Sequence, residues 1–423
     1  MSQPRTSFAL AGPLALSGLL LCARLLPAPA LSDPVAGAVA PSLYLKIPPL
    51  YLVLAPLFTL WDGVSMLSMS RLIGFLGGLV ILYLAWRLLR AAWLRYTGIR
   101  AGSIRSSLLT EALVLALAVT LLISFVVAGA LWHRPMLSLA GTEPEEMVVD
   151  FHSHTNVSHD VRDTWMKGYD AAANRRWHAR AGFDAAFVTD HNTVAGLPRQ
   201  TTDRAQRSAA GGLEGTVICP GVEVSAWRAH IVLLGNTGPI DRQPYTRSLD
   251  GLLGLLASSD SALGALSLAS LPEYRRNHWG RLDQLAAAGL DGFEIVNASP
   301  KANELTRAEI DTVVAVARTR NRFVAGVSDS HGWGATSMVW NLVRSTNGPA
   351  LDPCSAILRQ LRTGFPAVRI IERHRLRPDD WWPMWLTPLG VVWETWRGMG
   401  WALTAGWLAW IWIWVFARRR LRR

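Results

Sequence analysis

The chain has 423 residues, of which 50% are hydrophobic and 17% are charged, a low charged fraction for a soluble protein. The formal net charge is +11, and a strongly basic chain often binds nucleic acid. Most of the excess lies in two arginine clusters beside apolar segments, and no aromatic and basic platform for single strands is visible, so we expect no nucleic-acid partner. The clusters are Arg87, Arg90, Arg95, Arg100 and Arg105, and Arg418, Arg419, Arg420, Arg422 and Arg423.

Apolar residues concentrate near the start of the chain and indicate a membrane region at 1–135. We expect helices there at about 6–27, 47–69, 72–94 and 110–132. The first is either an uncleaved membrane helix or a signal peptide, and the spans that follow it favour the helix. The second contains Pro48, Pro49 and Pro56, so a kinked span and an interfacial segment are both open.

The last part of the chain, 381–423, begins with a Trp-rich interfacial segment and continues into an expected transmembrane helix at about 398–417 with a basic tail. Arginines collect on the cytoplasmic side of membrane proteins. We therefore expect a multi-pass protein of the plasma (inner) membrane, in contact with lipid, with a cytoplasmic C-terminus. The domain between the membrane regions is then extracytoplasmic, and the side of the N-terminus stays open.

Residues 145–376 alternate short apolar runs with helical patterns, which predicts a parallel sheet. Seven such strands predict an α/β fold with a closed or nearly closed barrel, whose functional residues lie at the C-terminal ends of the strands. The expected strands are Met147–Phe151, Ala185–Thr189, Val217–Cys219, His230–Leu234, Ala265–Ala269, Gly292–Val296 and Phe323–Val327. The expected helices include Thr164–Arg180, Arg281–Ala288 and Arg307–Thr319.

Six of the ten histidines and several carboxylates stand at or directly after the ends of these strands. A barrel brings the strand ends to one rim, where so many imidazoles and carboxylates are costly to bury without cations. Nitrogen and oxygen ligands without sulfur suit two or three divalent metal ions, such as Zn²⁺, Mn²⁺ or Fe²⁺. Sites of this kind activate a water and bind phosphate. The residues are His152, His154, His159, Asp160, Asp190, His191, Glu223, His230, Asp329 and His331.

Four segments resemble, in family order, the motifs of the polymerase and histidinol phosphatase (PHP) superfamily. They are Asp150–Thr155, Thr189–His191, Gly221–Glu223 with His230, and Ser328–His331. The resemblance covers about 145–335 and no membrane segment. It implies a distorted (β/α)₇ barrel of PHP type with a phosphoesterase site. By position it implies one ion at His152, His154, Glu223 and Asp329, a second shared by Glu223 and His230, and a third at His191, His331 and His159.

Two departures from the family pattern leave the ligand set open. The family commonly has Ser-Asp-Gly where this chain has Ser158-His159-Asp160, so either His159 or Asp160 is the ligand, and the spacing favours His159. The family's fifth strand usually ends in Ala-His-Pro, but this chain has Ala269-Ser270-Leu271-Pro272 and lacks that histidine. The second ion is then weakly bound, completed by water, or bound with help from His278.

Asp190 and Arg228 are the candidate catalytic residues. Asp190 can orient His191 or a neighbouring ligand, and Arg228 lies near a strand end, where a guanidinium can bind phosphate. Arg162, Arg275 and Arg276 are placed similarly, although a surface position is typical of each. The histidines for which the sequence indicates no site are His133, His178 and His374, and we expect His178 on a solvated helix face.

None of the three cysteines lies in a Cys-x-x-Cys pair, so no cysteine zinc site is expected. Cys22 lies in an apolar segment. A disulfide between Cys219 and Cys354 is open if the domain is extracytoplasmic, but buried free thiols are favoured.

These features predict a membrane-anchored, metal-dependent hydrolase of the phosphoesterase (phosphatase) class, which cleaves a phosphate mono- or diester through a metal-activated water. The substrate contains phosphate, and the membrane tether makes a lipid-linked phosphate a candidate. The alternative is a non-catalytic, metal-stabilised ligand-binding or sensor domain on a membrane anchor, which the missing fifth-strand histidine favours. A transport function is disfavoured because the expected spans carry few charges, Asp62 being the main exception.

Overall fold

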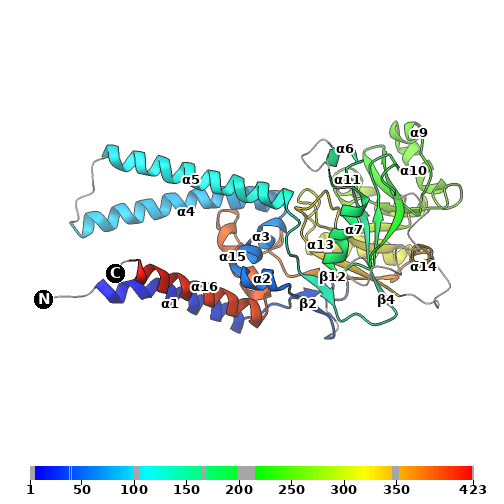
Figure 1. The fold of residues 1–423 in the computed structure, drawn as a ribbon. Helices are drawn as coiled ribbons and strands as arrows, with labels where there is room; N and C mark the ends of the chain where they lie inside the picture. The colour runs from blue at the N-terminus through cyan, green and yellow to red at the C-terminus, as the bar shows by residue number, and fades with distance from the viewer. Residues whose placement is uncertain are drawn as a thin grey trace.

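The computed structural model describes residues 5–37, 39, 41–98, 104–162, 168–197, 215–344 and 352–421. Long helices extend from one side of the molecule, and an α/β domain forms the other side (Figure 1). The start of α1 (Arg5–Leu25) and the end of α16 (Trp401–Arg420) lie at the far end of the helices, away from the α/β domain (Figure 1).

Four long helices form the extended side (Figure 1). They are α1 (Arg5–Leu25), α4 (Met69–Tyr96), α5 (Ile104–Leu131) and α16 (Trp401–Arg420). Among the described helices, only α4 and residues 109–129 of α5 are both long and apolar enough to cross a membrane. The prediction of spans at both ends of the chain is therefore supported only in part. The apolar part of α1 is short, Leu10–Leu25, while α16 mixes tryptophans with a basic end and packs along α1.

Residues 47–69 form two short helices instead of one continuous span. Helix α2 (Pro49–Val53) ends at Leu54, and α3 (Ala55–Ser65) begins at once with Pro56 in its first turn. Proline fits a first turn because its missing N–H has no partner there, but it ends the helix before it. Helix α3 then packs against α15 (Thr387–Gly398) and α16.

A buried cluster of charges joins these helices to the α/β domain. Asp62 of α3 accepts hydrogen bonds from Tyr51 Oη (2.7 Å), Arg134 Nη1 (2.5 Å) and Arg373 Nη1 (2.9 Å). Arg134 follows α5, and Arg373 ends the strand β12 (Val368–Arg373). Asp62, the main charge of the expected spans, is therefore a structural ion-pair partner where three parts of the chain meet.

Seven strands of a ten-stranded sheet curl around the core of the α/β domain. The seven are β4 (Glu146–Ser153), β5 (Ala185–Val188), β6 (Val217–Ala226), β7 (Ala229–Leu234), β8 (Leu266–Ala269), β9 (Gly292–Asn297) and β10 (Phe323–Val327). All seven expected strands form, but the sheet is not wholly parallel, because β7 runs antiparallel to both β6 and β8. The cause is a tight hairpin that turns the chain back between Ala226 and Ala229.

The two edges of this curled sheet meet at the C-terminal ends of β4 and β10. His154 N donates a hydrogen bond to Ser330 O (3.0 Å), and Asp329 N donates one to His152 O (2.9 Å). These bonds nearly close the sheet into a ring, so the architecture is consistent with the expected PHP-type barrel. Closure also places the segments after β4 and β10 beside one another.

A second link between the edges comes from outside the ring. Strand β11 (Val339–Arg344) pairs antiparallel with β4 and β12, and β12 pairs with β1 (Leu31–Ser32). The amide of Asn341 donates to Val149 O of β4 (2.8 Å), and its oxygen accepts from Gly326 N of β10 (2.8 Å). This buried side chain thereby bridges the two strands that the backbone does not pair along their length.

Helices cover the outside of the ring and show the expected amphipathic pattern. In α13 (Arg307–Thr319), Thr306 and Glu309 form a reciprocal capping box, and Ile310 and Val313 are buried against the sheet. Helix α7 (Ala171–Ala181) is shorter than the expected Thr164–Arg180, of which residues 164–167 lie outside the described part of the chain. The other elements of this side are α6 (His159–Arg162), α9 (Gln243–Thr246), α10 (Leu249–Ser258), α11 (Leu271–Asn277), η1 (Trp279–Arg281), α12 (Leu282–Ala287) and α14 (Pro353–Leu361).

Cys219 and Cys354 form a disulfide, so the prediction of free thiols is wrong. Cys219 lies in β6 and Cys354 in the first turn of α14, which packs on that strand. Their Cα atoms are 5.5 Å apart although 135 residues separate them in sequence. Only the tertiary packing brings them within the range of a disulfide.

Candidate metal centre

The predicted ligands converge at the rim where the strands of the ring end. His152 is in β4, and His154 follows it immediately. Glu223 and His230 face one another across the β6–β7 hairpin, with Glu223 Oε1 3.2 Å from His230 Nδ1. The other members follow strand ends or begin the next helix, and they are Asp160, His191, Asp329 and His331.

The first ligand group is buried and compact. His152 Nε2 lies 3.0 Å from His154 Nε2 and 3.2 Å from Glu223 Oε2, and Asp329 Oδ1 lies 3.2 Å from His154 Nε2 and 3.5 Å from His152 Nε2. Four ligands at about 2.1 Å from a tetrahedral ion are about 3.4 Å from each other. The spacing of the His152, His154 and Glu223 atoms therefore fits a single ion, and Asp329 lies beside the two imidazoles.

Tautomers show why this first group needs a cation. His152 Nδ1 lies 2.7 Å from Glu294 Oε1, and because a carboxylate only accepts, His152 donates there. Against the effect of burial, Glu223, Asp329 and Glu294 raise the pKa of His152, so Nε2 also carries a proton until a cation displaces it and leaves a lone pair there. That lone pair faces the Glu223 oxygen and the ring nitrogen of His154. An imidazole that donates one N–H to a carboxylate and presents its other nitrogen is typical of a metal ligand.

The second group uses both oxygens of the Glu223 carboxylate. His191 Nδ1 lies 3.2 Å from Glu223 Oε2, and His230 Nδ1 lies 3.2 Å from Glu223 Oε1. Glu273, which the sequence analysis did not select, lies at this group, with Oε2 3.9 Å from His230 Nδ1. That oxygen is buried and has no hydrogen-bond partner among the described residues. A buried carboxylate oxygen without a donor favours a cation nearby.

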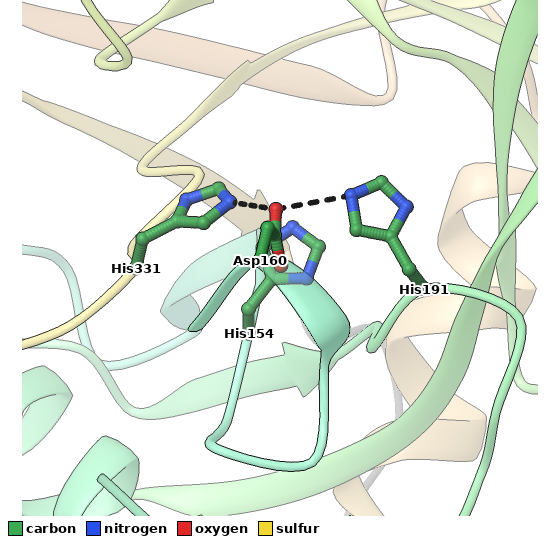
Figure 2. Close-up of side chains that lie close together, drawn as sticks. All are labelled: His154, Asp160, His191 and His331. Atoms are coloured by element: carbon green, nitrogen blue, oxygen red, sulfur yellow. Dashed lines mark hydrogen bonds and ion pairs between the residues drawn. The ribbon is translucent and has the colours of Figure 1, made fainter. Parts of the chain in front are cut away.

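The third group contains Asp160, His154, His191 and His331 (Figure 2). Asp160 Oδ2 lies between two imidazoles, 2.6 Å from His331 Nε2 and 3.2 Å from His191 Nε2. His331 Nδ1 donates to the Asp329 carbonyl (2.7 Å), so its Nε2 is the nitrogen available to an ion. The three groups share His154, His191 and Glu223, so the ions would lie close together.

The structure brings Asp160, and not His159, into the third group. The two residues begin α6, and only Asp160 points at His191 and His331. His159 is exposed, and its ring lies 4.8 Å from the His191 ring without contributing to any of the three groups. The preference for His159 over Asp160, which rests on the spacing of residues in an extended chain, is not supported, because a helix begins at these two residues.

Buried polar residues that the sequence analysis missed hold the ligands in place. Glu294 of β9 also accepts from Leu271 N (2.9 Å) and Asn297 Nδ2 (2.9 Å), which fixes the carboxylate that orients His152. Asp150 accepts from Ser328 N (3.0 Å), and thereby holds the segment that carries Asp329. A carboxylate inside an otherwise apolar strand is the pattern that would have identified both residues.

His178 is not on a solvated face. It is fully buried, and its Nε2 lies 2.8 Å from Asp150 Oδ2 while its Nδ1 lies 2.9 Å from Asn174 O. Arginines on the same helix favour exposure, but His178 lies on the buried face of the helix together with Asn174 and Trp177. His178 therefore supports Asp150 and through it the rim.

Asp190, a predicted catalytic residue, is buried and binds the chain just after His154. It accepts from Thr155 N (2.6 Å) and Thr155 Oγ1 (2.7 Å). Burial raises the pKa of Asp190 despite these two bonds. Asp190 does not line the cavity at the metal centre, so the geometry favours a positioning residue for His154.

Arg228, the other predicted catalytic residue, does not line that cavity. It is exposed, its backbone has φ of 51°, and its guanidinium lies 5.5 Å from the Trp227 ring centre. The hairpin turn points the side chain outward. His278 is also away from the groups, since its Nε2 lies 3.2 Å from the carbonyls of Trp227 and Arg228.

The groups open into a cavity of about 690 Å³. Its walls include Asp160, His191, Glu223, His230, Asp329 and His331, together with Ser270, Glu273, Arg276 and Lys301. Ser270 stands at the end of β8, where the family pattern has a histidine, and Glu273 comes one helical turn later. Arg276 and Lys301 are therefore the arginine and lysine at the cavity, in place of Arg228.

The charge balance of the metal-free centre also reflects the close packing of acids and imidazoles. Burial lowers the pKa of His154 to about 4, and neighbouring imidazoles add to this effect. Burial alone would lower the pKa of His331 and His230, but Asp329 and Asp160 raise the first to about 9, and Glu223 and Glu273 raise the second to about 9. Bound cations would replace these protons as the positive charges of the centre.

No protein-family model and no curated protein matches this chain. Solved structures that resemble it include PsfC from Pseudomonas syringae, with 18% identity over 59% of this chain and 96% of that chain, at a TM-score of 0.36. Another is a two-domain protein from Bacteroides vulgatus that contains a predicted PHP-like metal-dependent phosphoesterase, with 15% identity over 54% of this chain and 65% of that chain, at a TM-score of 0.34.

A third solved structure, from Bifidobacterium adolescentis, is assigned as a metal-dependent phosphoesterase and has 17% identity over 44% of this chain and 88% of that chain, at a TM-score of 0.29. The His and Glu side chains of this chain form clusters that fit a metal site, as the motifs predict.

Proposed function

We propose that this chain is a membrane-anchored, metal-dependent phosphoesterase that hydrolyses a phosphate mono- or diester. The proposal is supported by the convergence of three ligand groups that share His154, His191 and Glu223, with several of their members along the wall of one cavity. A lone histidine in a core needs only one carbonyl partner, whereas here the buried His152 ring lies between the carboxylates of Glu294 and Glu223.

The donor set suits two or three ions of Zn²⁺, Mn²⁺ or Fe²⁺. His152, His154, Glu223 and Asp329 would hold the first ion. Glu223 and His230, with Glu273 near them, would hold the second, while Asp160, His191 and His331 would hold the third. Ions bound in this way supply an activated water and neutralise charge on the phosphoryl oxygens.

Residues of this chain would do the remaining work at the cavity. Arg276 and Lys301 would bind the phosphate as it enters. Glu294 would keep the His152 ring in one tautomer, and Asp190 would hold the turn that carries His154. In the hydrolysis, water supplies the oxygen of the new P–O bond, the ester P–O bond breaks, and the leaving alcohol takes up a proton.

We further propose a plasma-membrane location with the α/β domain outside the cytoplasm. The far ends of α4 and α16 carry Arg95 and Arg418, and arginines collect on the cytoplasmic side. The start of α1 lies at the same end (Figure 1), which favours a cytoplasmic N-terminus. The disulfide between Cys219 and Cys354 supports the outward side, because disulfides persist in oxidising compartments.

The function can be tested with the full chain purified in detergent. The chain is stripped with a chelator, reloaded with Zn²⁺, Mn²⁺ or Fe²⁺ in turn, and assayed on p-nitrophenyl phosphate and bis-p-nitrophenyl phosphate. We expect turnover of at least one ester after reloading and none after stripping. If the chain binds stoichiometric metal but hydrolyses neither of these esters, and no phospholipid or glycerol phosphate ester, the result would favour a non-catalytic binding or sensor domain. Undiminished turnover after stripping would contradict a metal mechanism.

A further inference from the structure

One wall of the cavity at the metal centre comes from the membrane-side helices and not from the ring. Ser65, at the end of α3, and Met69, the first residue of α4, line the same cavity as Glu223 and His331. A cavity closed only by loops of the ring would have no such wall. The entrance to the metal centre is therefore shared with the start of a helix that is apolar enough to cross a membrane.

Hydrogen bonds fix this wall to the rim of the ring. Met69 N donates to Pro300 O (2.8 Å), and Asn303 Nδ2 donates to Met66 O (2.7 Å). Ser68 caps α4 by accepting from Arg71 N (3.2 Å), so the helix begins at a set position. The start of α4 and the segment after β9 are thus held together at the mouth of the cavity.

The mouth of the cavity at the start of α4 lies at the depth where lipid headgroups are expected. The first strongly exposed apolar side chain of α4 is Ile73, at 65% exposure. It comes four residues after Met69, which is about 6 Å along a helix. The headgroup layer of one leaflet is about 5–7 Å thick. If the hydrocarbon begins near Ile73, Met69 and the cavity mouth lie in the headgroup layer.

Exposed tryptophans give a second, independent level for the membrane. Trp381 and Trp385 are 73% and 50% exposed, beside the short helix η2 (Met384–Leu386). This segment packs closely on α4, since a Cβ added to Gly78 would lie 2.5 Å from the Trp385 carbonyl oxygen. Exposed tryptophans gather at membrane interfaces. The tryptophan level is therefore near residues 74–78 of α4, about 8–14 Å along the helix from Met69 and slightly deeper than Ile73, which places Met69 on the water-facing side of the headgroup layer.

The mouth also presents two cationic side chains. Arg276 and Lys301 are exposed, line the cavity, and form no ion pair with another residue in the described part of the chain. The neighbouring Arg275, by contrast, pairs with Glu309 at 3.0 Å. Cations beside an interface attract anionic headgroups.

We propose that the substrate is a phospholipid, whose phosphate binds at the metal centre while its acyl chains stay in the bilayer beside α4. This substrate class rests on the proposed phosphoesterase function. The wall of Ser65 and Met69 then guides the lipid from the leaflet into the cavity. A water-soluble ester of the same headgroup gains nothing from that wall and reaches the centre only by collision.

The test uses the full chain, loaded with metal, in phosphatidylcholine vesicles. Two matched pairs of substrates are compared, namely phosphatidic acid with glycerol 3-phosphate, and phosphatidylglycerol with glycerophosphoglycerol. We expect kcat/KM for one lipid to exceed that of its soluble partner by about tenfold or more, which corresponds to about 1.4 kcal/mol. Equal or faster turnover of the soluble partner would overturn the phospholipid substrate and leave the phosphoesterase function standing. Absence of turnover of all four compounds and of both p-nitrophenyl esters would instead contradict the function itself.

A matched pair of variants tests the wall. Met69→Asp places a charge at the cavity mouth, while Leu50→Asp places the same charge on an exposed position in the first turn of α2, away from the cavity. Both changes put an acid in the first turn of a helix, where it is tolerated. We expect Met69→Asp to lower lipid turnover about tenfold more than it lowers turnover of the soluble ester, and the remaining soluble turnover reports that the variant is folded. Leu50→Asp should keep both activities. Equal lipid turnover by the two variants would contradict the role of the wall.

Discussion

Glu223 is the residue on which the arrangement of the centre depends. Its Oε2 faces His152 and His191, and its Oε1 faces His230, so one buried carboxylate connects two ligand groups. The side chain is held in this position by the β6–β7 hairpin, in which Glu223 pairs with Val232. A shared carboxylate of this kind explains how ions of like charge could lie close together.

Metal binding should depend on pH in a defined direction. His230 and His331 have pKa values of about 9 in the metal-free centre, so both imidazoles carry a proton at pH 7. An ion binds only the neutral imidazole and must displace these protons. We expect the metal affinity of the stripped full chain to rise from pH 7 to pH 9, by up to about tenfold per pH unit for each proton displaced. Titration calorimetry in buffers of different ionisation enthalpy measures both the affinity and the protons released, and a flat profile would contradict the charge balance.

Arg276 and Arg228 give a matched comparison of phosphate binding. Arg276 lines the cavity, whereas Arg228 lies over the Trp227 ring outside it. A guanidinium that binds phosphate contributes about 1.5–3 kcal/mol through charged hydrogen bonds. We expect Arg276→Gln to raise KM for a phosphate ester about tenfold or more at similar bound metal, and Arg228→Gln to leave KM near its original value. If Arg228→Gln raised KM and Arg276→Gln did not, the phosphate would bind beside Arg228, outside the cavity.

The residues that sequence could identify are those that follow strands. His152, His154, His191 and His331 stand at strand ends in the pattern, and the structure brings them to one rim. Glu294 could not be assigned in this way, because its function depends on the His152 ring of a strand far away in sequence. Arg228 was assigned by its distance along the chain, whereas the direction of its side chain is set by a hairpin turn.

At the level of elements, the strands were predictable and their directions were not. Short apolar runs identified all seven strands of the ring, because buried strands need apolar side chains on both faces. The direction of β7 depends on a two-residue turn between Ala226 and Ala229 and on pairing with β8. Likewise, the disulfide depends on the packing of α14 against β6, which no local pattern indicates.

The junction between the helices and the α/β domain depends on the Asp62 cluster. Asp62→Asn would leave Arg134 and Arg373 buried without their acid, and removing one partner of a buried pair costs about 3–5 kcal/mol. We expect a marked fall in the thermal unfolding midpoint of the full chain in detergent. The control is Asp283→Asn, which removes an exposed ion pair with Arg320 and should leave the midpoint nearly unchanged. Equal midpoints for the two variants would show that the cluster does not hold the junction.

For the whole molecule, the arginine clusters and the positions of the helix ends predict one orientation. A fluorescent protein that folds only in the cytoplasm, fused to the C-terminus of the full chain, should be fluorescent. Alkaline phosphatase, which is active only outside, should be inactive at the same position. An active phosphatase fusion with a dark fluorescent fusion would reverse the orientation.

Under non-reducing conditions, one cysteine per chain, Cys22, should react with maleimide after denaturation, and all three should react after reduction.

Catalytic metal bound by the histidines and carboxylates of the rim would explain the whole arrangement of the site. The most direct measurement determines bound metal and phosphate-ester turnover on the same samples of the full chain, for the original sequence and for His152→Ala, with His374→Ala as control, since His374 pairs with Glu394 outside the rim. We expect two or three divalent ions per original chain, fewer in His152→Ala together with a loss of turnover of about 100-fold or more, and no change in His374→Ala. Full metal content and full turnover in His152→Ala would contradict the account.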